Sequence, residues 1–258
     1  MSSPRTSIAD LIAARVRAPG TRHPFVLGIA GAQGSGKSTV ARELAARFAC
    51  PVLSLDDLYL DGDARTRLAA EIHPLLRTRG VPGTHDPARG LAVIEALGQP
   101  GTTLLPRFDK ARDEPGAPEV WQGPADMLIL EGWCLGAHPQ PETELAAPVN
   151  ALEREQDADR VWRRWVNRRL AEYRPLFDRI DMLVFLAAPG FEVVQSWRTE
   201  QELTLKRALG PGAGMTDAEL AAFIQHYQRL TEHMLRHAPD WADITITLDA
   251  QRQVLRAQ

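Results

Sequence analysis

Cysteine is scarce in this chain of 258 residues: only Cys50 and Cys134 occur, and their spacing is not that of paired metal ligands. We therefore expect neither a disulfide framework nor a cysteine-bound metal, and we expect both thiols to be reduced and without a chemical role. An excess of charge of one sign is also missing. A net charge of −3 provides no general basic field, which argues against nucleic acid as a partner.

Long apolar segments are absent as well. No run is long enough to span a membrane, and residues 1–10 lack the apolar core of a signal peptide. Both observations lead us to expect a cytoplasmic protein that does not bind membranes. Internal repeats and linker-like stretches are also lacking, so the sequence predicts one domain over residues 1–258, with a helical extension at about 1–22.

What the chain does contain is a complete phosphate-binding loop (P-loop). Residues 31–38 read Gly-Ala-Gln-Gly-Ser-Gly-Lys-Ser and directly follow the apolar run 24–30. The glycines let backbone N–H groups approach phosphate oxygens, Lys37 reaches the β- and γ-phosphates, and the Ser38 hydroxyl can bind Mg²⁺. The sequence therefore predicts a site for ATP or GTP, formed by Gly31, Ala32, Gln33, Gly34, Ser35, Gly36, Lys37, Ser38 and Thr39.

The order of apolar patterns predicts an α/β fold. Strands are expected at 24–30, 51–55, 102–106, 126–131, 181–187 and 243–248, and helices at 37–49, 64–78, 88–97, 157–173, 191–209 and 217–236. Strands that alternate with helices predict the three-layer P-loop NTPase sandwich, with a mostly parallel central sheet. We expect 102–106 to be an edge strand, 111–124 a polar loop, and about 190–210 a lid-like helix.

Charged side chains follow several of these strands, and ligands of parallel α/β folds lie beyond the carboxyl ends of the strands. Phosphoryl transfer to an alcohol needs one carboxylate to accept the hydroxyl proton and a second acidic group to hold Mg²⁺. Asp56 or Asp57 suits the first role and Glu131 the second, although the two aspartates could instead cap a helix. The expected strand at 102–106 is followed by Arg107, Asp109 and Lys110.

Other polar residues allow two interpretations each. Arg198 can stabilise charge on the γ-phosphate from the lid helix, or it can pair with Glu202 one turn later. His85 and Asp86 lie in a loop of turn-forming residues and are candidate site residues, but Asp86 can also cap the helix at 88–97. We expect the arginines of the long helix region to form a solvated face: Arg154, Arg160, Arg163, Arg164, Arg168, Arg169 and Arg174.

Five segments occur in an order that resembles the D-glycerate 3-kinase family. They are Gly-Ala-Gln-Gly-Ser-Gly-Lys-Ser-Thr (31–39), Ser-Leu-Asp-Asp-Leu-Tyr (54–59), Gly-Val-Pro-Gly-Thr-His-Asp (80–86), Leu-Pro-Arg-Phe-Asp-Lys-Ala (105–111) and Leu-Glu-Gly-Trp-Cys-Leu-Gly (130–136). Further matches are Pro-Val-Asn-Ala-Leu-Glu (148–153), Ser-Trp-Arg-Thr-Glu-Gln-Glu (196–202) and Phe-Ile-Gln-His-Tyr-Gln-Arg-Leu-Thr (223–231). The resemblance extends over about residues 24–248. It implies a P-loop kinase, related to uridine kinase, phosphoribulokinase and pantothenate kinase, that converts D-glycerate and ATP to 3-phosphoglycerate and ADP.

The resemblance also implies roles for individual residues. In the larger group the first acidic residue of Ser-x-Asp-x-x-Tyr is the base, which selects Asp56 and leaves Asp57 as a metal ligand beside Ser38 and Glu131. Lys37 and Arg198 join Asp56 as catalytic residues, and the cofactors are ATP and Mg²⁺. The implied acceptor site contains Asp56, Tyr59, His85, Asp86, Arg107, Asp109 and Lys110. Arg107, Lys110 or Arg198 would hold the acceptor carboxylate, for which a bidentate arginine is well suited.

Two other functions stay open from the sequence. The first is a kinase of the same group that acts on a nucleoside or a pantothenate-like alcohol, and the second is a P-loop ATPase or switch that acts on a protein partner. A switch is the weaker of the two, because the chain contains no Asn-Lys-x-Asp segment that reads guanine and Asp56 would have no hydroxyl group to serve. We therefore expect a small-molecule kinase.

Overall fold

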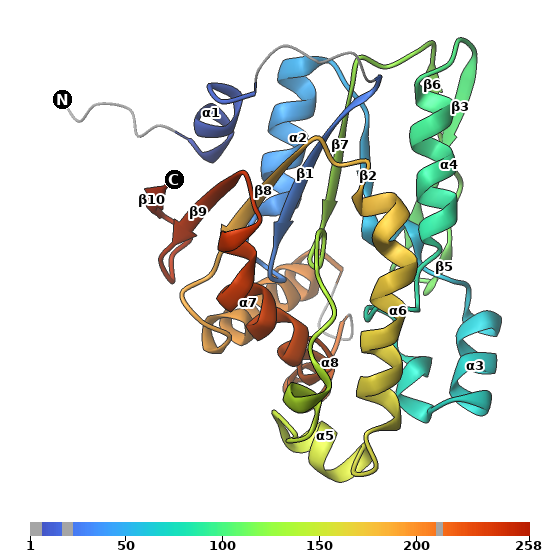
Figure 1. The fold of residues 1–258 in the computed structure, drawn as a ribbon, viewed down its shortest axis with the longest axis vertical. Coiled ribbons are helices and arrows are strands. Elements are labelled where there is room, and N and C mark those ends of the chain that lie inside the picture. The colour runs from blue at the N-terminus through green and yellow to red at the C-terminus, as the bar shows by residue number, and fades with distance from the viewer. Residues whose placement is uncertain (1–6, 17–22, 210–213) are drawn as a thin grey trace.

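A six-stranded sheet lies at the centre of the computed structural model, which describes residues 7–16, 23–209 and 214–258 (Figure 1). The strand order is β10-β9-β8-β1-β7-β2, and all neighbours pair in parallel except β10, which is antiparallel to β9. This arrangement confirms the predicted α/β class with a mostly parallel sheet. The strands are β1 (Phe25–Gly31), β2 (Val52–Ser54), β7 (Met127–Gly132), β8 (Met182–Ala187), β9 (Ile244–Leu248) and β10 (Val254–Ala257).

Helices cover both faces of this sheet. One face packs against α1 (Ile8–Ala13), α2 (Lys37–Phe48) and α7 (Glu192–Leu209), and the other against α4 (Pro87–Leu97), α6 (Val161–Phe177) and α8 (Asp217–His237). Each face forms its own hydrophobic core. In β1, Leu27 and Ile29 belong to the core with α1, α2 and α7, whereas Val26 and Ala30 belong to the core with α4, α6 and α8. A strand that is buried on both sides is apolar at almost every position, which explains why these segments read as continuous apolar runs.

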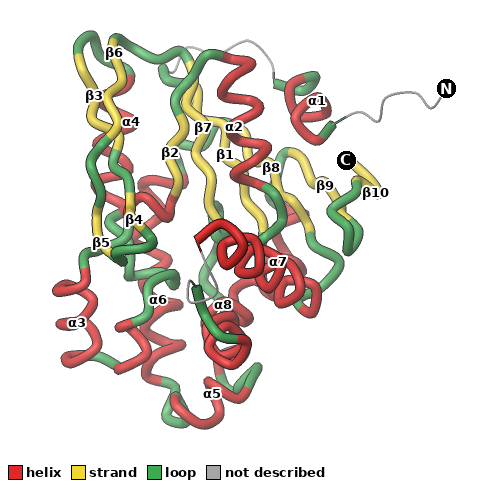
Figure 2. Tube along the Cα trace, turned by 180° about the vertical axis from the view of Figure 1, so that it is seen from behind, coloured by secondary structure: helices red, strands yellow, loops and turns green. Residues whose placement is uncertain are grey.

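The carboxyl ends of the parallel strands point to one end of the molecule. Figures 1 and 2 show α7 and α8 crossing this end, with α3 (Gly62–Glu71) and α5 (Ala151–Gln156) farther out. The segments that follow β1, β2 and β7 therefore open toward α7 and α8, and they carry the P-loop, Asp56 and Asp57. No helix in the described part of the chain is both long and apolar enough to cross a membrane.

Two predicted helices have different limits in the structure. The helix expected at 64–78 ends at Glu71, and residues Pro74–Arg77 form a separate 3-10 turn. Pro74 lacks the N–H group needed to continue the helix, and it favours the extended conformation that His73 adopts. The helix expected at 157–173 is α6, which begins four residues later and continues to Phe177, with Pro175 in its last turn.

The region between β2 and β7 departs most from the prediction. The strand expected at the sheet edge, β3 (Thr102–Leu105), pairs only with β6 (Glu119–Gln122) in a separate two-stranded sheet. A second small ladder joins β4 (Phe108–Asp109) to β5 (Glu114–Pro115). The expectation of a loop at 111–124 was therefore wrong. Its strands are short and largely exposed, and Glu119–Gln122 does not alternate apolar with polar residues, so backbone pairing forms them without a pattern that the sequence could display.

The ends of the chain add two smaller findings. The antiparallel strand β10 was not predicted, and of the expected helical extension at 1–22 the structure describes α1, while residues 1–6 and 17–22 lie outside the described residues. The expected lid at about 190–210 corresponds to α7, and residue 210 also lies outside the described part. Cys50 and Cys134 are buried, and both thiols are free.

Candidate active site

The P-loop connects β1 to the first turn of α2 and packs closely against α7. Gly34 and Gly36 have φ angles of +78° and +93°, in the left-handed region that favours glycine. A Cβ atom on Gly34 would lie 2.5 Å from the Cβ atom of Trp197 in α7, so a larger residue would push α7 off the loop. Arg252 donates to the Gly34 carbonyl oxygen at 2.6 Å and holds the same turn from the other side.

Several buried polar atoms of this loop have no hydrogen-bond partner within the described residues. They are the Ser35 hydroxyl and both polar side-chain atoms of Gln33. Buried polar groups normally find partners, so a set of them at one loop indicates a surface built for a polar ligand. Of the other predicted nucleotide-binding residues, Ala32 packs in the core and Thr39 lies exposed on α2.

A carboxylate from a neighbouring strand meets the P-loop. Glu131, at the end of β7, is buried, and its Oε1 atom accepts hydrogen bonds from the hydroxyl groups of Ser38 and Ser54, both at 2.9 Å. The structure thus brings together Ser38 and Glu131, which lie 93 residues apart in the chain. A hydroxyl oxygen beside a carboxylate is a set of oxygen ligands that suits Mg²⁺.

Asp56 follows β2 and lies beside the P-loop lysine. Its Oδ2 atom pairs with the Lys110 ammonium group at 2.6 Å, and its Oδ1 atom accepts from the Tyr59 hydroxyl at 2.8 Å. Burial alone would raise the pKa of Asp56, but the charges of Lys110 and Lys37 and the hydrogen bonds from Lys110 and Tyr59 hold it well below its ordinary value. The carboxylate is therefore ionised and held in one orientation.

Asp57 points elsewhere, although it is the next residue. Its oxygens accept from the backbone N–H groups of Ser54 and Phe108, at 3.3 and 3.1 Å, and Oδ2 pairs with Arg107 at 3.2 Å. Burial raises the pKa of Asp57, and the charge of Arg107 opposes the rise. Asp57 is thus part of the capping box of the 3-10 helix Leu55–Leu58, the alternative that the sequence had left open, and its oxygens are occupied within the protein.

A cleft of about 660 Å³ lies between the P-loop and α8. Sequence-predicted residues on its wall are Gln33, Gly34, Lys37, Ser38, Asp56, Tyr59, Lys110, Glu131 and Arg198. The cleft thus joins the nucleotide-binding loop and the candidate base in one space. Arg198 matches both of its interpretations, because it lines the cleft and also pairs with Glu202 at 2.6 Å.

Four predicted acceptor residues do not line this cleft. His85 is buried behind Tyr59, with ring centroids 4.5 Å apart, and burial lowers its pKa to about 4, so it is neutral at neutral pH. Asp86 caps α4 by accepting from the Arg89 N–H group at 2.9 Å. The remaining two are Asp109, which accepts from the backbone N–H groups of Ala111 and Arg112, and Arg107, which pairs with Asp57 and Glu119.

Sequence reasoning missed five residues of the cleft wall: Arg79, Trp133, Gln201, Phe223 and Tyr227. Four of them lie within family-like segments: Trp133 in 130–136, Gln201 in 196–202, and Phe223 and Tyr227 in 223–231. Arg79 directly precedes the segment at 80–86. The segments gave Phe223 and Tyr227 no role, because residues of α8 that face a ligand cannot be told apart from the apolar stripe of the helix.

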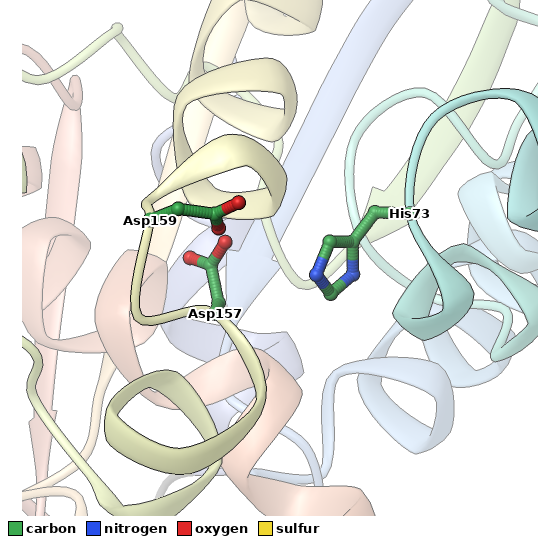
Figure 3. A group of neighbouring side chains, drawn as sticks. All are labelled: His73, Asp157 and Asp159. Atoms are coloured by element: carbon green, nitrogen blue, oxygen red, sulfur yellow. The ribbon is translucent and has the colours of Figure 1, made fainter.

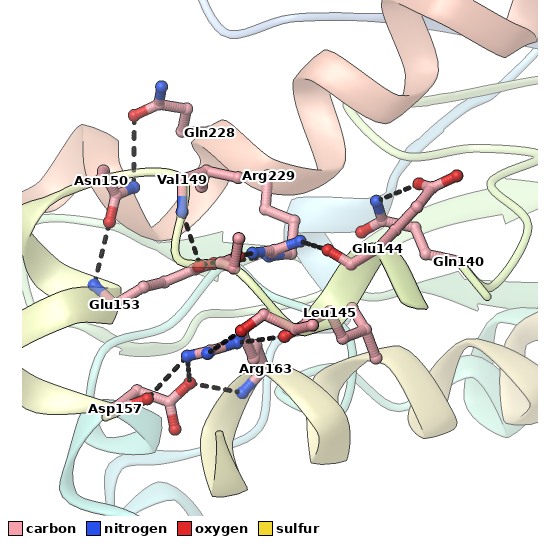
Figure 4. A network of polar contacts seen from close by, with 12 residues as sticks. Gln140, Glu144, Leu145, Val149, Asn150, Glu153, Asp157, Arg163, Gln228 and Arg229 are labelled. Atoms are coloured by element: carbon pink, nitrogen blue, oxygen red, sulfur yellow. Dashed lines mark hydrogen bonds and ion pairs between the residues drawn. The ribbon is translucent and has the colours of Figure 1, made fainter. Parts of the chain in front are cut away.

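A buried network of charges fixes the position of α8. Arg229 forms an ion pair with Glu153 at 2.6 Å, and Arg163 pairs with Asp157 at 2.8 Å; both acids are fully buried (Figure 4). Each arginine also donates to backbone carbonyl groups of the segment before α5, including that of Leu145. The expectation that Arg163 belongs to a solvated face was therefore wrong. Its partners, Asp157 and the Leu145 carbonyl group, precede α6 in the chain, and helical spacing within α6 does not reveal them.

A second group of potential metal ligands lies at the start of α6. His73, Asp157 and Asp159 offer ligand atoms within 4.8 Å of one another (Figure 3). Arg163 already balances the charge of Asp157, and His73 Nδ1 accepts from the Leu75 N–H group at 3.3 Å. We therefore assign no cation to this group, and the Ser38–Glu131 pair is the better candidate.

Comparison with known proteins identifies the family. No family model matches the chain. The chain is 34% identical over 221 residues to the uncharacterized kinase mug58 of Schizosaccharomyces pombe, covering 79% of this chain and 78% of that protein. It is 30% identical over 224 residues to the chloroplastic D-glycerate 3-kinase of Arabidopsis thaliana, covering 79% of this chain and 46% of the longer plant protein.

A solved structure agrees with these sequence relatives. The D-glycerate 3-kinase of Cryptococcus neoformans superposes with a TM-score of 0.78 at 26% identity, covering 98% of this chain and 99% of that one. The match therefore includes the helices around the cleft as well as the central sheet, and it confirms the resemblance found in the sequence motifs. The chain belongs to the D-glycerate 3-kinase family of P-loop kinases and is an ATP-dependent phosphotransferase.

Proposed function

We propose that the chain transfers the γ-phosphoryl group of ATP to the 3-hydroxyl group of D-glycerate, which forms 3-phosphoglycerate and ADP. The supporting observation is the cleft, which places an oriented carboxylate, Asp56, beside the P-loop residues Lys37 and Ser38. The relatives from Arabidopsis and Cryptococcus are named D-glycerate 3-kinases, which favours this acceptor over other alcohols.

The proposed nucleotide site uses the P-loop backbone and two side chains. Lys37 binds the β- and γ-phosphates, and the unpartnered polar groups of Gln33 and Ser35 belong to the same loop. Ser38 and Glu131 would hold Mg²⁺, which when bound supplies positive charge to the phosphate oxygens. Asp57, whose oxygens are occupied by Ser54, Phe108 and Arg107, is not included in this metal site.

The acceptor hydroxyl group lies at Asp56 in this proposal. Its oxygen forms a bond to the γ-phosphorus, the bond from that phosphorus to the β–γ bridging oxygen breaks, and Asp56 takes the hydroxyl proton. A low pKa makes Asp56 a weak base, but phosphoryl transfer has a loose transition state in which the proton can leave late. Orientation of the hydroxyl group by a fixed carboxylate is then the larger contribution, and the bonds from Tyr59 and Lys110 supply it.

The proposal predicts a strict preference for a carboxylate-bearing acceptor. We expect ADP formation to depend on D-glycerate, with kcat/KM for glycerol lower by about 10²-fold or more, because a cationic wall is left unpaired without the carboxylate. ADP release is measured against a panel of D-glycerate, L-glycerate, glycerol, uridine and pantothenate. Activity with uridine or pantothenate but none with D-glycerate would remove the glycerate assignment.

A second prediction concerns the pH dependence of the reaction. Lys110 holds the pKa of Asp56 low, so removal of its charge in Lys110→Met should raise that pKa toward the ordinary value. Because the base must be ionised, the acid limb of kcat/KM should move upward by about one pH unit or more. Arg107→Met is the matched control, since Arg107 pairs with Asp57 and lies outside the cleft. An acid limb that is identical in wild type and Lys110→Met would contradict the assignment of Asp56 as the base.

A further inference from the structure

The cleft contains one more positive charge than the proposed roles use. Its wall carries Lys37, Arg79, Lys110 and Arg198 against the carboxylates of Asp56 and Glu131. Lys37 is assigned to the phosphates, Arg198 pairs with Glu202, and Lys110 pairs with Asp56. Arg79 has no role in this scheme, although it directly precedes the family-like segment at 80–86.

The charge of Arg79 is only partly neutralised. Its partner is Asp113, but the same carboxylate also binds Arg65, whose side chain is 1% exposed. Arg65 donates to both carboxylate oxygens, at 3.1 and 2.7 Å, and to the Asp113 carbonyl oxygen at 2.9 Å. One carboxylate thus serves two guanidinium groups, so this wall of the cleft keeps a surplus positive charge. A surplus of this kind favours an anionic ligand.

The backbone of Arg79 is held by two aromatic residues of the cleft. The Tyr227 hydroxyl donates to the Arg79 carbonyl oxygen at 3.1 Å, and Trp133 Nε1 donates to the Gly80 carbonyl oxygen at 3.0 Å. Gly80 has a φ angle of +131°, and a Cβ atom there would overlap the Tyr227 hydroxyl group. The guanidinium group therefore projects from a fixed backbone, which lowers the entropy lost when it binds a ligand.

Tyr59 contacts the candidate base and lies close to the guanidinium group of Arg79. The Tyr59 hydroxyl contacts Asp56 at 2.8 Å, while the guanidinium carbon of Arg79 lies 6.0 Å from the centroid of the same ring. Resting on the function proposed above, we propose that Arg79 binds the carboxylate of a short hydroxy acid whose terminal hydroxyl group lies at Asp56. A small acceptor can then meet both groups at once, and Arg79 determines the specificity for an acid.

Arg107, which the sequence had favoured for this role, serves as the natural control. Its guanidinium group is occupied by Asp57, Glu119 and the carbonyl oxygens of Val52 and Pro106. Both arginines are partly exposed and each pairs with an aspartate, so their substitutions are comparable. Only Arg79 lines the cleft.

The test compares Arg79→Met and Arg79→Lys with Arg107→Met in steady-state assays of both substrates. For Arg79→Met we expect KM for D-glycerate to rise on the order of 10²-fold while KM for ATP stays within about two-fold, because the lost bidentate contact serves only the acceptor. For Arg79→Lys, KM for D-glycerate should lie between the values of wild type and Arg79→Met, since an ammonium group is a single-point donor. Arg107→Met should leave KM for D-glycerate unchanged within about two-fold, because its side chain contacts no acceptor.

Chemical rescue separates a binding role from a structural one. In Arg79→Ala, added guanidinium ion at millimolar concentration should lower KM for D-glycerate and leave KM for ATP unchanged; a defect in folding would not respond in this way. Mg²⁺–ATP should still raise the melting temperature of each variant, which shows that the nucleotide site is intact.

The two proposals fail in different ways. If wild type phosphorylates D-glycerate and Arg79→Met has the wild-type KM for it, Arg79 is not the carboxylate ligand, whereas the proposed function stands. If wild type prefers another hydroxy acid, the glycerate assignment fails, and the Arg79 variants with that acid should show the same selective rise in KM. Activity with neutral alcohols alone would overturn both.

Discussion

Asp56→Asn should lower kcat by about 10²–10⁴-fold while nucleotide affinity changes little. An asparagine keeps the size of the side chain and can still accept from the Tyr59 hydroxyl, but it cannot take a proton or pair with the charge of Lys110. The loss should appear in kcat for every acceptor that the enzyme uses. Rates of ADP formation give kcat, and calorimetric titration with ATP or a nonhydrolysable analogue gives the affinity.

Asp57→Asn is the matched control, because it makes the same chemical change one residue later. Asp57 caps the 3-10 helix and pairs with Arg107, so we expect a loss of stability instead of a loss of catalysis. A partly exposed ion pair is worth up to about 1 kcal/mol, which corresponds to a melting temperature lower by about 2–4 °C. If Asp57→Asn lost more kcat than Asp56→Asn, the base would be Asp57, and Asp56 would have to be the structural residue of the pair.

The fold could be predicted from sequence where burial on both faces leaves a clear pattern. The strands β1 and β8 are apolar throughout, and β7 is apolar up to Glu131, so their positions followed from composition. The strands β5 and β6 could not be found in this way. They are held by backbone pairing in an exposed ladder, and their side chains contribute no periodic signal.

The same distinction applies to the site. Lys37, Ser38 and Glu131 follow strands whose carboxyl ends meet, so topology alone brought them together. For Asp56 and Asp57, by contrast, only a change of backbone direction in the 3-10 helix decides which carboxylate enters the cleft. Motif matching also does not tell which residues line the cleft: Asp86 and Asp109 accept hydrogen bonds from local backbone N–H groups and are not on its wall.

Sequence patterns did not reveal the roles of residues whose partners come from distant elements. Arg79 is held by Asp113, from a loop predicted to be irregular, and by Tyr227, from a helix 148 residues away. Arg163 looked like one of several solvated arginines, yet it is buried against Asp157. In both cases the partner determines the role of the arginine, and the partner is fixed by tertiary packing.

Lys37→Ala should abolish phosphoryl transfer, with kcat/KM lower by on the order of 10³-fold or more, because the ammonium group stabilises charge that develops on the phosphates. Its side chain lines the cleft and belongs to neither core, so the melting temperature without nucleotide should stay within about 2 °C of wild type. The rise in melting temperature that Mg²⁺–ATP causes in wild type should be strongly reduced.

Arg47→Ala provides the control for Lys37→Ala, since it removes a cation from the far end of the same helix. Arg47 is exposed and pairs with Asp10, so kinetics and nucleotide-dependent melting should both match wild type. The pair of variants also tests whether the activity belongs to this chain, because a contaminating kinase would give the same rate in both preparations. Wild-type turnover by a folded Lys37→Ala protein would therefore remove the P-loop from the mechanism, and with it every role proposed for the residues around the phosphates.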